Sequence, residues 1–136
     1  MPVKKIIVPF YGNVKSKYVL EYASELALAS NSKLSCICSF NDKSGNNLRN
    51  DFKDTYHTKI SYLNIINKIL YKKNVPYEVI LSKNNIIKNI QEISSSGCLM
   101  MVVAGMSDPN MIYLAEEQMH VTTLLLCEDK FMFNSD

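Results

Sequence analysis

The stretch KKIIVPF at residues 4–10, together with the helical pattern of residues 16–30 and the run KLSCICSF at 33–40, decides the fold class. The two short runs are apolar almost throughout, which is typical of strands buried on both faces. Between them, apolar and small side chains recur at helical spacing and predict one buried helix face: Val19, Tyr22, Ala23, Leu26, Ala27 and Ser30. A strand, a helix and a second strand in this order predict a parallel β-α-β unit.

The same alternation continues along the rest of the chain. Apolar residues at spacings of three and four predict a long amphipathic helix over 51–73, which Pro76 prevents from continuing. The elements predicted after it are a strand at 77–82, a short helix built on Ile86, Ile87, Ile90 and Ile93 and capped at Gly97, a strand at 98–105, a helix at 110–119 and a strand at 121–127. Residues 41–50 are predicted to form a loop and 128–136 a frayed tail. We therefore predict one α/β domain over 1–136, with a doubly wound, five-stranded parallel sheet and helices on both faces.

The composition argues against several classes of function. Fifteen basic and 13 acidic residues give a net charge of +2 without a basic stripe, so we expect no nucleic-acid partner. The apolar runs are far shorter than the roughly 20 residues that cross a bilayer, so we expect no membrane partner and a cytoplasmic location. Cys36 and Cys38 share a strand face, but no neighbouring residue completes a zinc site, and neither His57 nor His120 has a recognisable nucleophile partner. We predict no metal and no enzymatic activity.

Two long segments of the chain resemble the universal stress protein family. KKIIVPFYGNVKSKYVLEYASELALASNSKLSCICSF (4–40) is similar to that family's first strand, helix and second strand. NVPYEVILSKNNIIKNIQEISSSGCLMMVVAG (74–105) is similar to its third strand, third helix and fourth strand. The resemblance implies a sheet in the order 3-2-1-4-5 and, often, a homodimer joined through the last strand.

The residues that bind ATP in one branch of that family are replaced in this sequence. The family's Asp at the end of the first strand corresponds to Tyr11, although Gly12 is retained. The phosphate motif G-x2-G-x9-G-[ST] begins at Gly105, but its other positions fall on Asp108, Gln118 and Met119. The resemblance therefore implies a stress protein that has lost its ATP site.

Local chemistry gives the same prediction for the loop after residue 105. Asp is a preferred N-cap and proline is favoured at the first helical position, so Asp108-Pro109 predicts a helix start. A capping carboxylate would use the N–H donors that a phosphate needs. Tyr11 either fills the cleft or stacks on a base, and we favour filling.

The leading hypothesis is a non-catalytic, homodimeric stress-adaptation protein that acts by contact with a protein partner and has no cofactor. The alternative is an atypical member that binds ATP or AMP, and a third hypothesis is an α/β domain with an unrelated small ligand. The residues that would bind a ligand are Pro9, Phe10, Tyr11, Gly12, Asn13, Ser39, Phe40, Ala104, Gly105, Met106, Ser107 and Asp108. The residues predicted at the dimer interface are Val121, Thr122, Thr123, Leu124, Leu125 and Leu126.

Overall fold

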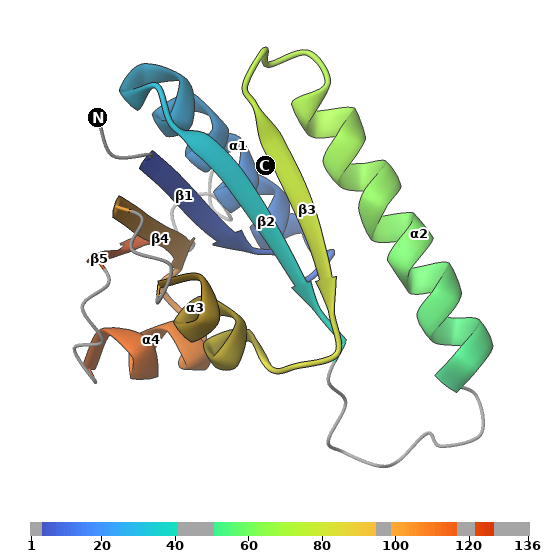
Figure 1. The fold of residues 1–136 in the computed structure, drawn as a ribbon. Coiled ribbons are helices and arrows are strands. Elements are labelled where there is room, and N and C mark those ends of the chain that lie inside the picture. Colours follow the sequence, from blue (N-terminus) through green and yellow to red (C-terminus); the bar gives the residue numbers. More distant parts are fainter. Residues whose placement is uncertain (1–3, 41–50, 95–98, 117–121, 127–136) are drawn as a thin grey trace, which may run out of the picture.

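A computed structural model describes residues 4–40, 51–94, 99–116 and 122–126 of the chain (Figure 1). Strands and helices alternate throughout these ranges, as the sequence predicts. The elements are β1 (Lys4–Pro9), α1 (Val14–Ser30), β2 (Lys33–Ser39), α2 (Asp51–Leu70), β3 (Tyr77–Ser82), α3 (Ile86–Ser94), β4 (Leu99–Gly105), α4 (Pro109–Glu116) and β5 (Thr122–Leu126). The predicted loop at 41–50, the cap at Gly97 and the tail at 128–136 lie outside the described residues, as does His120.

The five strands form one parallel sheet in the order β3-β2-β1-β4-β5. Side chains of α1 and α2 pack with alternate strand residues in one apolar cluster. Side chains of α3 and α4 pack with the remaining strand residues in a second cluster, which has Ile7 and Ile37 at its centre. The two clusters lie on opposite faces of the sheet because successive strand side chains alternate between faces. The predicted doubly wound architecture is therefore confirmed (Figure 1).

The buried face of α1 differs from the prediction by a rotation of about one residue. Tyr22, predicted to face the core, is 44% exposed, whereas Leu20 and Ser24 are fully buried. The buried set is Ser16, Val19, Leu20, Ala23, Ser24 and Ala27. The small residues Ala23 and Ser24 in the middle of this set let the helix pack closely on the sheet. The large Tyr22 ring therefore lies at the edge of the helix–sheet interface.

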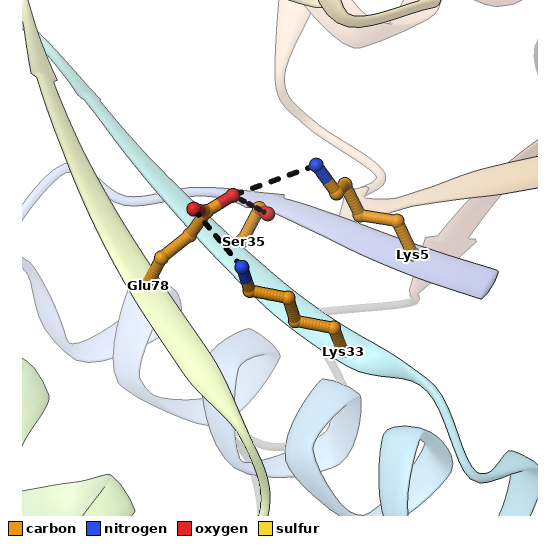
Figure 2. Close-up of polar contacts among 4 residues, drawn as sticks. All are labelled: Lys5, Lys33, Ser35 and Glu78. Atoms are coloured by element: carbon orange, nitrogen blue, oxygen red, sulfur yellow. Dashed lines mark hydrogen bonds and ion pairs between the residues drawn. The ribbon is translucent and has the colours of Figure 1, made fainter. Parts of the chain in front are cut away.

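A polar cluster lies on the α3 and α4 face of the sheet, near the amino ends of its strands (Figure 2). Glu78 on β3 accepts a hydrogen bond from the Ser35 hydroxyl at 2.7 Å. Its carboxylate also pairs with Lys33 at 3.2 Å and with Lys5 at 3.5 Å. The hydrogen bond from Ser35 and the two lysines lower the pKa of Glu78 below its usual value. The cluster thus joins three neighbouring strands through ionised side chains.

The described residues carry neither a membrane span nor a metal cluster. No helix in these ranges combines the length and the apolar character that crossing a bilayer requires. No group of three His, Cys, Asp or Glu residues within these ranges is placed to hold a metal ion. Cys36 and Cys38 are both buried in the core, where a hydrogen bond from the Cys36 S–H to Cys38, followed by burial, raises the pKa of the Cys36 thiol. The Cys36 thiol is therefore held in its protonated form within the core.

Candidate functional site

The candidate site lies where the order of the strands reverses. The chain runs outward from β1 through β2 to β3, and then returns to the other side of β1 with β4 and β5. The loops that leave the carboxyl ends of β1 and β4 therefore diverge to opposite faces of the sheet and leave a crevice between them. Both loops lead directly into helices, α1 and α4, whose N-termini border this crevice.

The loop after β1 is held in a single shape by contacts from two helices. Asn13 is the N-cap of α1 and its side chain accepts a hydrogen bond from the Ser16 N–H at 2.8 Å. The Ser16 hydroxyl in turn accepts the Tyr11 N–H at 2.9 Å. From α2, the Tyr62 hydroxyl donates to the Tyr11 carbonyl oxygen at 2.7 Å. Gly12 has a φ of 81°, which glycine adopts without strain, and its Cα faces the Tyr62 ring.

The loop after β4 is organised by Asp108, as the sequence predicts. The Asp108 N–H donates to the Gly105 carbonyl and closes a turn after the strand. One carboxylate oxygen, Oδ1, accepts the N–H groups of Asn110 at 3.0 Å and of Met111 at 3.4 Å. Pro109 is the first residue of α4. The predicted N-cap is confirmed, and it uses two of the free N–H donors at the start of this helix.

The two loops are joined by a hydrogen bond between Tyr11 and Asp108. The Tyr11 hydroxyl donates to Oδ2 of Asp108 at 2.6 Å, so the two carboxylate oxygens serve different partners. Burial, followed by the hydrogen bond to Asp108, raises the pKa of Tyr11 well above its ordinary value. Tyr11 is 38% exposed. Its hydroxyl reaches a carboxylate on the far loop, so Tyr11 bridges the crevice.

A pocket of about 330 Å³ remains beside this bridge, at the small end of the range for ligand sites. Six of the predicted site residues line it: Pro9, Tyr11, Asn13, Gly105, Ser107 and Asp108. Lys15, Ser16, Val19, Pro109 and Asn110 also line it, and the sequence did not single them out as ligand-binding residues. Lys15 is the chemically important addition because it brings a cation. The signal available in the sequence was its position two residues after Asn13, the last predicted ligand-binding residue of that segment, in what is the first turn of α1.

The other predicted site residues lie outside the lining of this pocket. Phe10 and Ala104 are buried in the two core clusters, and Met106 is 54% exposed. Phe40 has its ring centroid 5.6 Å from that of Tyr62. Ser39 donates its hydroxyl to the Asn84 carbonyl. Gly12 lies beneath the Tyr62 ring.

The lining of the pocket combines opposite charges with neutral polar groups. The described residues that form it include one cation, Lys15, and one anion, Asp108, with hydroxyl and amide groups around them. The lining contains neither histidine nor cysteine, and the only carboxylate in it already accepts three hydrogen bonds.

The sequence matches no family model and no curated protein. The structure, in contrast, is similar to solved universal stress proteins. Universal stress protein UspA from Lactobacillus plantarum gives a TM-score of 0.72 at 10% identity, covering 93% of this chain and 99% of that one. The universal stress protein from Archaeoglobus fulgidus in complex with dAMP gives 0.71 at 15% identity, covering 93% and 100%. A universal stress protein family protein from Arabidopsis thaliana with AMP bound gives 0.61 at 16% identity, covering 95% of each chain. This protein therefore has the universal stress protein fold.

Proposed function

We propose that this protein is a non-catalytic, homodimeric regulator of the universal stress protein type, which acts in stress adaptation by protein contact and without ATP. The observation that carries the proposal is the double use of Asp108, which caps α4 through one oxygen and accepts Tyr11 through the other. The N–H groups that a phosphate would need are bonded to this carboxylate. Its charge adds a repulsion of about 1 kcal/mol or more at an effective dielectric of ~20.

The backbone of the loop after β4 also argues against a phosphate cradle. A cradle needs several successive N–H groups turned toward one anion, which glycines allow because they adopt conformations that other residues avoid. Gly105 is followed by Met106, Ser107 and Asp108, and the turn closes on the Gly105 carbonyl. The loop is therefore shaped around its own cap.

The proposed dimer would form through β5. This strand is at one end of the sheet order and pairs with β4 alone among the described strands. An uncovered edge is an aggregation hazard, and pairing with a second copy across a two-fold axis removes it. Thr122, Thr123, Leu124, Leu125 and Leu126 form β5, whereas Val121 lies outside the described residues.

The second candidate function is binding of an adenine nucleotide in an atypical manner, and Lys15 is the observation that favours it. Lys15 lines the pocket beside the Tyr11–Asp108 bridge, so an anion could be neutralised there without the α4 donors. The solved structures of this fold with dAMP and with AMP make a nucleoside monophosphate the natural probe.

Thermal shift of the full chain distinguishes the two functions. ATP, ADP, AMP, cyclic AMP and cyclic dinucleotides at millimolar concentration should leave Tm unchanged, because only a ligand that binds the folded state raises it. A clear rise with ATP would overturn the leading proposal. A rise with AMP alone would support the alternative, provided that Lys15→Ala abolishes it and Lys88→Ala, on the exposed side of α3, does not.

A further inference from the structure

A second concave surface lies between α1 and α2, on the face of the sheet away from α3 and α4. It has a volume of about 710 Å³ and is lined by Lys17, Glu21, Ile65, Lys68, Ile69, Lys72 and Lys73. We call this surface the α1–α2 groove. None of these residues lines the pocket at Tyr11 and Asp108, so the groove is a separate feature of the fold.

The groove combines an apolar strip with a strong local charge. Ile65 and Ile69 are four residues apart on α2, so their side chains lie along one line, and both pack onto the core beneath. Four lysines face one glutamate, Glu21, in the lining, although the whole chain carries a net charge of only +2. Four lysines and one glutamate give the lining a net charge of +3, more than that of the whole chain, beside one apolar strip.

Most of this charge is not neutralised within the described part of the chain. Lys73 pairs with Glu25 at 3.9 Å, but Lys17, Lys68 and Lys72 form no ion pair with any residue of the described ranges. Lys68 is in the last turn of α2, where a cation favours the helix dipole. Lys17, in contrast, is near the N-terminus of α1, where a cation is unfavourable to the helix. Helix stability therefore does not account for the whole cluster.

We propose that the α1–α2 groove binds an acidic amphipathic helix of a partner protein. Such a helix would place apolar residues on Ile65 and Ile69 and carboxylates opposite Lys17, Lys68 and Lys72. A nucleic acid fits less well, because no aromatic or arginine side chain lines the groove for stacking or bidentate contacts. A membrane surface fits less well too, because a flat bilayer does not reach the floor of a concave groove. This inference rests on the proposed action by protein contact and names the chemistry of the partner.

The test uses a fluorescein-labelled synthetic peptide of about three heptads, with leucine at the first and fourth positions and glutamate or glutamine elsewhere. Fluorescence anisotropy of this peptide with the full-length protein should show saturable binding that weakens as salt is raised. Lys68→Glu with Lys72→Glu should weaken it about tenfold or more, because two attractions become repulsions. The control is Lys83→Glu with Lys88→Glu, which makes the same charge change at two exposed positions, one just before α3 and one within it. This control should alter the affinity for the peptide less than about twofold. Circular dichroism checks that both variants are folded.

Several outcomes would overturn the proposal. The groove is not the binding surface if the control loses as much affinity as the groove variant. Binding is merely electrostatic if a peptide with glutamine in place of leucine binds equally well. The surface is a membrane contact if vesicles of phosphatidylcholine and phosphatidylserine bind and the peptide does not. None of these results depends on the nucleotide thermal shift. The experiments therefore distinguish a failure of this inference from a failure of the proposal that the protein does not bind ATP.

Discussion

The hydrogen bond between Tyr11 and Asp108 links the two halves of the sheet across the crevice, and its removal is the sharpest test of the site. Tyr11→Phe deletes the donor and keeps the ring. Asp108→Asn removes the charge of the acceptor and keeps a residue that caps helices well. Tyr11→Phe is therefore confined to the 2.6 Å contact between the hydroxyl and Oδ2, whereas Asp108→Asn also weakens the acceptor of the α4 cap.

The expected magnitude follows from the charge of the acceptor and the exposure of the donor. Hydrogen bonds to charged groups contribute about 1.5–3 kcal/mol. Tyr11 is 38% exposed, so water replaces part of the lost bond, and we expect Tyr11→Phe to lower the free energy of unfolding by about 1 kcal/mol. For a chain of 136 residues this corresponds to a decrease of about 4 °C in Tm.

The assay is a double-mutant cycle measured by urea unfolding with circular dichroism. Tyr11→Phe, Asp108→Asn and the double variant should give a coupling energy of about 1 kcal/mol. A coupling energy within about 0.3 kcal/mol of zero would refute the reasoning, because the two side chains would then act independently.

From the same hydrogen bond we expect the stability of the protein to depend on pH in the alkaline range. The pKa of Tyr11 is raised in the folded protein, mainly by burial and then by Asp108, so the folded state holds this proton more tightly than the unfolded state. Its contribution to stability is fully present below the unfolded pKa of about 10 and is lost as the pH rises beyond it. The stability difference between the wild type and Tyr11→Phe should therefore shrink above about pH 10. A difference that grows there would have the wrong sign.

Three further predictions concern the loop, the polar cluster and the edge of the sheet. Gly12→Ala should cost about 2 kcal/mol or more in urea unfolding, because φ is 81° and a Cβ would overlap the Tyr62 ring; a cost below about 0.5 kcal/mol would contradict this. Glu78→Gln should reduce the loss of stability on acidification. The pKa of Glu78 is lowered in the folded protein, mainly by Ser35, so its contribution to stability is present above the unfolded pKa and is lost as the pH falls through the folded pKa. Unfolding free energies of the two proteins that fall in parallel with pH would count against this. Leu124→Lys should give a monomer in light scattering, and an unchanged mass would argue against pairing through β5.

The Asp108 cap and the order of the elements could be predicted because they depend on residues close together in the chain. The buried strand KKIIVPF ends at a glycine turn, and its apolar run requires helices on both faces whatever the details of packing. Asp108 bonds N–H groups two and three residues ahead, so propensity alone indicates it. Errors arose where packing decides, as with the exposed Tyr22 ring on α1.

The tertiary structure alone decided which distant residues meet. Tyr11 and Asp108 are 97 positions apart, and Tyr62 reaches the Tyr11 carbonyl from 51 positions away. No local sequence pattern encodes these contacts. The order of the strands brings the ends of β1 and β4 together, and the packing of α2 on α1 places Tyr62 over the loop after β1. The lysines of the α1–α2 groove are likewise scattered in the sequence and gather only when the two helices pack. The sequence by itself determined a parallel α/β chain with a capped α4, whereas the bridged crevice and the basic groove exist only because the fold joins segments that local chemistry leaves independent.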